Sequence, residues 1–454
     1  MRKHVMIRTR LIYPVAMAGL FIFMPRPQQA AELRHLTLNE AVSLALSQNH
    51  LLKIARLRVA EREQKKAGER SSYFPSINNQ SNILHVTELQ TIGIPAGAFG
   101  SAGGTLVPAQ GIDLPQGKTT LFTSGTQMSQ PLTQLLRIRE DNRIATADVA
   151  VSRDDLKKAE TELAVQVYNL YYEILIAHLQ RKAVGQETEA ATERLRESEE
   201  DVRNGTALKV AALQGRTGVL QSRQAELTLD LQLEDLNTEL NDLVGLPLNT
   251  ELDLDPAVVV NIELRPREEY LQSAWADNPD ISSATEKLQK AQASVRAGKL
   301  MYVPDVTAYA RYSYQDGVPF LVRNFGIFGV SLSYDVFDFG KRRAAVRERE
   351  EQLAQVEENL RRVKDRVAVL IERAYHKVER TRNLVEVTNE VVKLHQENER
   401  LAQNQLNQGS LLVAEHRQAT ADTYKAQADS LQANLGYLLA WAELQQATGH
   451  TPRF

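Results

Sequence analysis

The chain has 454 residues, of which 43% are hydrophobic and 24% charged, and its formal net charge is −3. This is the composition of an ordinary folded protein, and it lacks the basic excess of a nucleic-acid-binding surface. There is no cysteine, which excludes disulfides, thiolate metal sites, cysteine nucleophiles and a lipid anchor on cysteine.

The first 31 residues have the pattern of a secretory signal peptide. Basic residues precede an apolar stretch from Leu11 to Met24, which is shorter than the roughly 20 residues that span a bilayer. Cleavage is expected after Ala30 or Ala31, and the alternative is a retained single-span anchor. No other long apolar run follows, so we expect an exported protein that is soluble, peripheral or a β-barrel.

The mature chain is expected to begin with a helix from Leu36 to Arg70 that breaks at Asn49. Thr37 and Glu40 have capping-box spacing at its start, and Pro75 stops it.

Two strands are expected next, at about 76–90 and 118–132. Both are mostly polar, and only a second occurrence of the pattern later in the chain supports a strand pair here. The loop between them, through Gly93–Gly117, is rich in Gly, Ala and Pro. Its segment from Gly111 to Thr119 has the wrong spacing for a phosphate-binding loop, so we expect an exposed flexible loop.

A long helical hairpin completes the first unit. Residues 139–203 contain no proline and keep an apolar seam of alternating three- and four-residue steps, which is typical of a coiled coil. At about 1.5 Å per residue, this helix is on the order of 100 Å long. Gly205 ends it, and Thr206 is expected to cap a returning helix over about 206–245. The unit therefore covers residues 32–246, and a proline-containing linker, 247–266, follows.

The same unit occurs again over residues 267–449, before a tail at 450–454. Its strands are expected at about 304–316 and 325–338, and its helices at about 340–408 and 410–447. The matching residues of the two copies include Asn49 and Asn278, Pro75 and Pro304, Gly205 and Gly409, Gly245 and Gly449. This duplicated helix–strand–strand–long-hairpin unit predicts a mainly α protein with a smaller β part.

The strands of the second unit alternate strictly between apolar and polar residues. This pattern suits a half-buried sheet or a membrane barrel. Four strands cannot close a barrel, and open edges do not survive in lipid because their N–H and C=O groups lack partners. Several chains must therefore contribute transmembrane strands to one barrel, with their helical hairpins packed around the same axis.

These features resemble the TolC-type outer-membrane efflux channels. The resemblance rests on the signal peptide, the duplicated unit, the helix–proline–strand junctions at Pro75 and Pro304, and the tip glycines Gly205 and Gly409. It implies a homotrimer with a 12-stranded β-barrel in the bacterial outer membrane, continued by an α-helical barrel as a tunnel in the periplasm. It also implies a passive exit duct of a tripartite efflux or type I secretion system. A periplasmic adaptor (membrane fusion) protein and an inner-membrane pump, proton-driven or ATP-driven, would open its periplasmic tip.

The resemblance also points to particular residues. It places Gly205 and Gly409 at the entrance and implies acidic residues just beyond the second glycine, where this chain has Glu415 and Gln418. Three Glu415 carboxylates near the axis would favour cations and could bind a multivalent cation; the alternative is an ordinary solvated glutamate. The candidates for the barrel interior are the polar strand residues Asp305, Thr307, Arg311, Ser331, Ser333 and Asp335.

No catalytic, metal or cofactor site is expected. None of the nine histidines has metal-ligand spacing, and no two carboxylates are paired in a predicted cleft. The chain is therefore expected not to be an enzyme. The alternative function is a periplasmic coiled-coil structural or adaptor protein without a pore. The strand pairs argue against it, because an adaptor would need a compact lipoyl-like or sandwich module.

Overall fold

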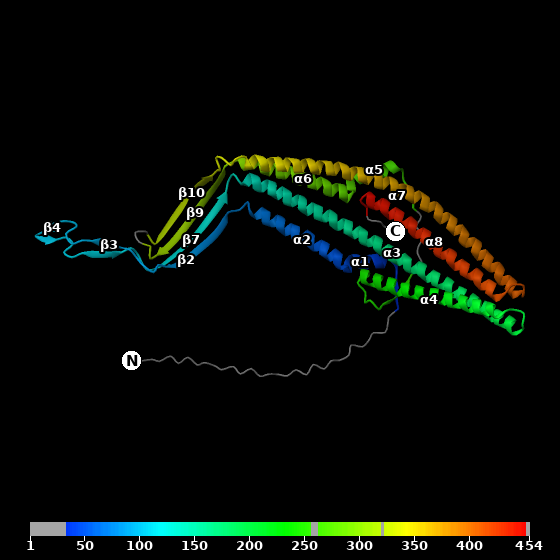
Figure 1. The fold of residues 1–454 in the computed structure, drawn as a ribbon. Helices are drawn as coiled ribbons and strands as arrows, with labels where there is room; N and C mark the ends of the chain where they lie inside the picture. The colour runs from blue at the N-terminus through cyan, green and yellow to red at the C-terminus, as the bar shows by residue number, and fades with distance from the viewer. Residues whose placement is uncertain (1–32, 256–261, 319–321, 451–454) are drawn as a thin grey trace, which may run out of the picture.

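The computed structural model describes residues 33–255, 262–318 and 322–450. The predicted signal peptide (1–31), the middle of the 247–266 linker and nearly all of the 450–454 tail lie outside the described residues. The molecule is long and thin, with a β-sheet towards one end and a layer of long helices towards the other (Figure 1).

One antiparallel sheet contains the four long strands. Its order is β10-β9-β7-β2, and the strands are β2 (Ser76–His85), β7 (Thr120–Pro131), β9 (Asp305–Asp316) and β10 (Asn324–Ser333). Each copy of the unit supplies one hairpin, and β7 pairs with β9 to join them.

Two of these strands are shorter than the sequence predicts. β2 ends at His85, which pairs with Thr120, the first residue of β7. β10 ends at Ser333, which pairs with Asp305, the first residue of β9. In both cases the ladder stops where the partner strand ends, although the Val86 N–H still donates to the Thr119 carbonyl at 2.8 Å. Asp335 therefore lies beyond the sheet rather than on its polar face.

The segment between β2 and β7 is exposed, as predicted, but it is not irregular. Two short ladders stiffen it into an arm that projects beyond the sheet (Figure 1). They pair β3 (Thr91–Ile94) with β6 (Ile112–Pro115), and β4 (Ser101–Ala102) with β5 (Thr105–Leu106). Strands this short leave no periodicity that a sequence pattern could reveal.

Eight α-helices are assigned within the described residues. They are α1 (Leu38–Gln48), α2 (His50–Ser71), α3 (Leu135–Arg203), α4 (Lys209–Val244), α5 (Arg267–Asp277), α6 (Pro279–Lys299), α7 (Lys341–Asn407) and α8 (Val413–Ala447). The predicted break at Asn49 is confirmed, because its side chain accepts the backbone N–H of Leu51 at 2.9 Å and starts α2. Asn278 does the same for α6. Among the described helices, none combines the length and hydrophobicity needed to cross a bilayer.

α3 and α7 run the full length of the helical layer. Next to the sheet, the neighbouring helices follow the order α2–α3–α6–α7, and in the far half α4 and α8 take the places beside α3 and α7 (Figure 1). The parallel strand pair β1 (Leu33–Leu36) and β8 (Glu251–Leu254), together with α1 and α5, adds a further layer on these helices.

A buried ion-pair cluster joins the two units close to the sheet. Glu140 of α3 is 6% exposed, and its carboxylate accepts hydrogen bonds from Arg143 and from Arg296 of α6, each at 2.7 Å. Burial alone would raise the pKa of Glu140, but the contacts with Arg296 and Arg143 outweigh it and hold that pKa below its usual value. The carboxylate therefore remains charged and fixes α6 against α3.

Candidate functional site

The helical layer has two different faces, and α5 covers one of them. Arg267 of α5 forms an ion pair with Glu372 of α7 at 3.0 Å, and Tyr270 lies edge-on to Tyr375. Arg366 precedes Tyr375 by nine residues, which at about 100° per residue places it on the opposite side of α7. There Arg366 lines a cavity of about 650 Å³.

α3 shows the same division. Glu162 lines that cavity, whereas Tyr171, nine residues later, points the other way and donates its hydroxyl to the Leu36 carbonyl of β1 at 3.0 Å. In α8, Glu443 lines the cavity, while Trp441 contacts Tyr270 of α5. The face marked by Glu162, Arg366 and Glu443, here called the open face, is thus the one that α1, α5, β1 and β8 leave uncovered.

On α8, residues at multiples of seven before Glu443 share its open face, and Glu415 is one of them. Glu415, Asp422 and Asp429 precede Glu443 by multiples of seven residues, and seven-residue steps keep to one side of a helix in coiled-coil packing. The Glu415 carboxylate is exposed and also accepts the Leu412 backbone N–H at 3.2 Å, which caps α8. The pore-lining role of Glu415 stays a prediction.

Sequence reasoning missed a second acidic residue on this side of α8. The resemblance implies acidic residues here, but this chain has Gln418 at the second of the two positions. Gln418 donates a hydrogen bond to Asp422, one turn further on, at 3.1 Å. The seven-residue step from Glu415 to Asp422 was the signal that could have found it.

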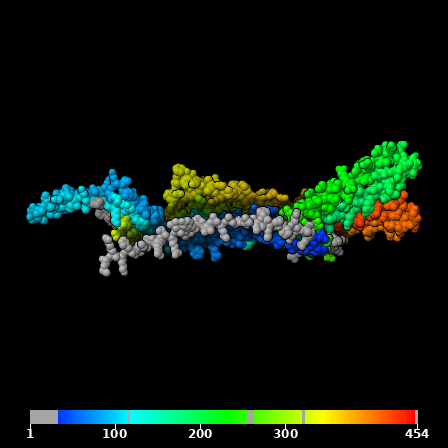
Figure 2. All heavy atoms as spheres, turned by 90° about the horizontal axis from the view of Figure 1, so that it is seen from below, coloured from blue at the N-terminus to red at the C-terminus, as the bar shows by residue number. Residues whose placement is uncertain are grey.

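The two hairpin tips lie side by side at the end remote from the sheet (Figures 1 and 2). Gly205 and Gly409 have φ values of 75° and 72°, the left-handed conformation in which glycine ends a helix. The expectation that the next residue caps the returning helix was wrong. The hydroxyls of Thr206 and Ser410 donate backwards, to the carbonyls of Asp201 and Gln405. The N-caps are Leu208 and Leu412, so α4 and α8 begin at Lys209 and Val413.

The predicted polar strand residues gather on one face of the sheet, with the exception of Asp335. Thr307 pairs with Ser331, and Asp305 with Ser333. Arg311 lies flat against Gly125 of β7, where a Cβ would stand 2.7 Å from its guanidinium. On β9 and β10 the opposite face is apolar and uncovered, with exposed fractions of 88%, 65% and 68% for Phe328, Val330 and Leu332.

Both side edges of the molecule are also uncovered. In the sheet, β2 and β10 are the edge strands among the described strands. α4 exposes Leu213, Leu220 and Leu227, at seven-residue spacing, by 62%, 61% and 60%. α7 turns a stripe of exposed apolar residues away from α8, with steps of three, four and seven residues. They are Leu384, Val387, Val391, Leu394 and Leu401.

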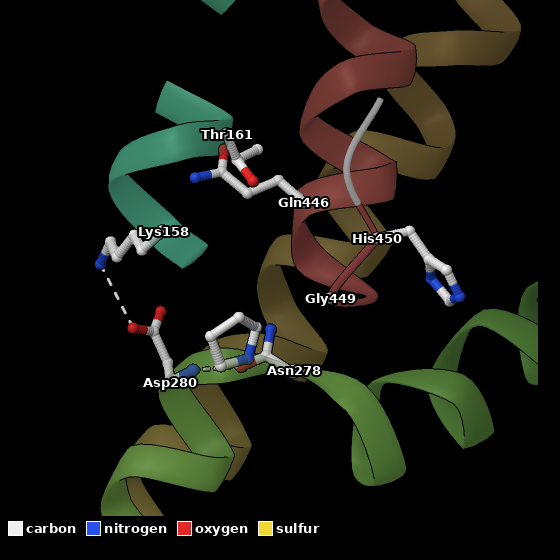
Figure 3. A pocket seen from close by; sticks show the side chains of 8 residues that line it. Lys158, Thr161, Asn278, Asp280, Gln446, Gly449 and His450 are labelled. Atoms are coloured by element: carbon white, nitrogen blue, oxygen red, sulfur yellow. Dashed lines mark hydrogen bonds and ion pairs between the residues drawn. The ribbon is translucent and has the colours of Figure 1, made fainter. Parts of the chain in front are cut away.

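A small pocket lies where α8 ends against the start of α6 (Figure 3). Lys158 pairs with Asp280 there at 3.2 Å, and Gly449 lies beside Asn278. Its volume of about 20 Å³ has room for a water molecule and no organic ligand. Among the residues that the structure describes, no cluster of three or more His, Asp or Glu side chains is arranged to hold a metal ion.

Comparison with known proteins gives the following. A sequence profile described as "Outer membrane efflux protein" matches residues 41–246 and 270–450. A search of curated proteins finds no match. The CmeC outer membrane channel of Campylobacter jejuni superposes with a TM-score of 0.72 at 16% identity, over 91% of this chain and 85% of that chain. The outer membrane protein VceC of Vibrio cholerae gives 0.67 at 15% identity, over 91% and 96%. The open state of the MtrE outer membrane channel of Neisseria gonorrhoeae gives 0.63 at 17% identity, over 91% and 89%. At these identities the structural matches show a common fold.

Proposed function

The chain belongs to the outer membrane efflux protein family, and on that premise we propose that it is the passive exit duct of a tripartite efflux or type I secretion system. The family is one of outer-membrane channels with a periplasmic tunnel, not of enzymes. The observation that carries the proposal is that neither the four-stranded sheet nor the helical layer closes within one chain.

A ring of copies closes both. β2 and α4 form one side edge and β10 and α7 form the other, so the contact between copies joins two different surfaces, as in a cyclic oligomer. Three copies supply twelve strands. The unpaired backbone groups of β10 then find those of β2 in the next subunit, and the leucine stripe of α4 covers the apolar stripe of α7.

The open face lines the lumen of this ring. If the covered face pointed inwards, the α1, α5, β1 and β8 of all three subunits would fill the interior of the twelve-helix ring. The covered face therefore has to point outwards. In the barrel, Phe328, Val330 and Leu332 face lipid, and the polar residues Thr307 and Arg311 face the channel.

The hairpin tips at Gly205 and Gly409 then form the periplasmic entrance. We infer that an adaptor protein and an inner-membrane pump engage this end and move the hairpins apart. The tips contain no bulky packing partner at either glycine, since nothing lies within 4 Å of a Cβ placed there. Such an end is free to move without disrupting a core.

The test of the duct is electrical. Protein extracted from the outer membrane in detergent should migrate as a heat-resistant trimer on gels and should produce single-channel steps in planar bilayers. A monomer without conductance after mild extraction would contradict the duct and favour the pore-free structural protein.

Glu415→Ala should reduce the preference of the channel for cations. Each carboxylate attracts a cation at ~4 Å by about 1 kcal/mol in water. A passing cation comes within that distance of one carboxylate at a time, so removing the ring should lower the cation-to-anion permeability ratio by about fivefold and weaken block by divalent and trivalent cations. The reversal potential in a salt gradient measures the ratio. The control is Glu199→Ala, which removes an exposed acid of α3 near the same tip. Unchanged selectivity in Glu415→Ala would remove this residue from the pore.

A further inference from the structure

We propose that the lumen contains a basic belt that binds small polyvalent anions, with carboxylate or phosphate groups, on their way through the duct. This inference rests on the proposed function. The belt consists of Lys287 of α6 and Arg362, Arg366 and Arg373 of α7. It is located at the level where α6 begins and α8 ends.

The belt surrounds a real cavity. All four side chains line the 650 Å³ space on the open face between α3, α6, α7 and the end of α8. A space of this size accommodates a small organic ligand. It exists because α6 and α8 meet end to end between the continuous helices α3 and α7, which leaves a gap that neither helix fills.

The belt cations have no acidic partners. No described carboxylate lies within ion-pair distance of Lys287, Arg366 or Arg373. Arg362 donates to the neutral amide oxygen of Asn359 at 2.8 Å. Arg362 and Arg366 are also one helical turn apart, and a like-charged pair at this spacing destabilises a helix by about 0.2–0.5 kcal/mol. Neither arginine forms an ion pair with a described acid of α7, and the nearby Glu358 is paired with Arg361.

Acidic residues of the cavity only partly balance the belt. Asp280 is paired with Lys158 at 3.2 Å, and Glu443 with Lys377 at 2.6 Å. This leaves two acidic residues that line the cavity, Asp155 and Glu162, to balance the charge of the four belt cations. The cavity therefore keeps an excess of positive charge, repeated in each subunit of the ring.

The belt contrasts with the lumen nearer the tips. There, Glu415, Asp422 and Asp429 of α8 give the open face a negative stripe, and Lys425 on the same side is paired with Glu187 of α3. An anion that has passed the negatively charged entrance therefore reaches a positively charged site about halfway along the lumen. Arginine suits this role because its planar fork binds carboxylate and phosphate through two hydrogen bonds.

The test compares two double variants of α7 in planar bilayers, with inorganic pyrophosphate as the blocking anion. The belt variant is Arg362→Gln/Arg366→Gln. The matched control is Arg361→Gln/Lys364→Gln, which removes the same charge from the covered side of the helix. Lys364 precedes Tyr375 by eleven residues, which at about 100° per residue puts both on one side.

Pyrophosphate should block the current of the unmodified channel. In the belt variant the concentration for half-block should rise about tenfold, equal to about 1.4 kcal/mol, while the control stays within twofold of the unmodified channel. The charge-conserving variant Arg362→Lys/Arg366→Lys should give a half-block concentration between those of the unmodified channel and the belt variant, because it keeps the charge and loses the two-bond fork. The single variant Arg373→Gln should also raise the pyrophosphate concentration for half-block. It tests the belt on its own if the double variant fails to assemble.

The possible failures are distinct. An unmodified protein that never conducts contradicts the duct itself. A conducting channel whose pyrophosphate block is absent, or equal in the belt variant and the unmodified protein, overturns the belt and leaves the duct intact. An equal weakening in the control reduces the effect to overall charge and also overturns the belt.

Discussion

Replacing both Leu220 and Leu227 of α4 by glutamate should abolish the trimer and, with it, the conductance. In one chain these side chains are 61% and 60% exposed, and a ring of copies would bury them against α7 of the next subunit. Burying a leucine contributes about 1.5–3 kcal/mol, so each interface should lose about 3–6 kcal/mol. Burying the introduced carboxylates costs more still. Migration on gels without heating and light scattering in detergent would report the loss.

The control for this experiment is Gln221→Glu/Thr228→Glu, which adds the same charge to α4 one residue further along. Both of these polar positions are exposed, and each lies about 100° round the helix from the leucine stripe. The control should still assemble and conduct. A trimer that persists in the leucine variant would mean that α4 is not at the subunit interface, and the order of helices in the ring would have to be revised.

The sequence predicts most of the architecture because its strongest signals are local and occur twice. Asn49 and Asn278 each break a helix by accepting the N–H groups of the next turn. Gly205 and Gly409 each end a long helix in the left-handed conformation. These effects depend on a few consecutive residues, so they can be predicted from the sequence without knowledge of the fold.

The errors concern features that depend on distant residues or on very short segments. Thr206 and Ser410 have the right side chains for an N-cap, but the glycine turn brings a carbonyl five residues back within reach of their hydroxyls. The arm between β2 and β7 contains strands too short to show a period.

The belt escaped notice for a different reason. On α7 alone, Arg362, Arg366 and Arg373 look like ordinary solvated charges. The role of these arginines depends on two features of the fold. The packing of α5 determines which face of α7 is covered, and the gap between α6 and α8 creates the cavity. Both involve helices that are far apart in the sequence.

Gly449→Ala should destabilise the protein more than the same change at any other helix-ending glycine. Gly449 has a φ of 84°, and a Cβ there would stand 2.0 Å from the Asp277 carbonyl oxygen and 2.8 Å from the Asn278 nitrogen. These are backbone atoms at the junction of α5 and α6, and the Asn278 side chain donates a 2.7 Å hydrogen bond to the Ala447 carbonyl. Relief of the contact therefore requires the two helices to separate from α8.

The other glycines provide a graded comparison. At Gly409 nothing lies within 4 Å of a Cβ, so Gly409→Ala should cost only the left-handed strain of about 1–2 kcal/mol. At Gly245 the nearest atom, 2.7 Å away, belongs to the flexible side chain of Gln48, so the cost should be intermediate. Gly449→Ala should exceed about 4 kcal/mol, in the range of severe core disruption. Thermal unfolding of the purified trimers should rank the variants in this order. Equal stability of Gly449→Ala and Gly409→Ala would show that the end of α8 does not pack against the α5–α6 junction. That result would remove the end-to-end arrangement of α6 and α8 on which the cavity depends.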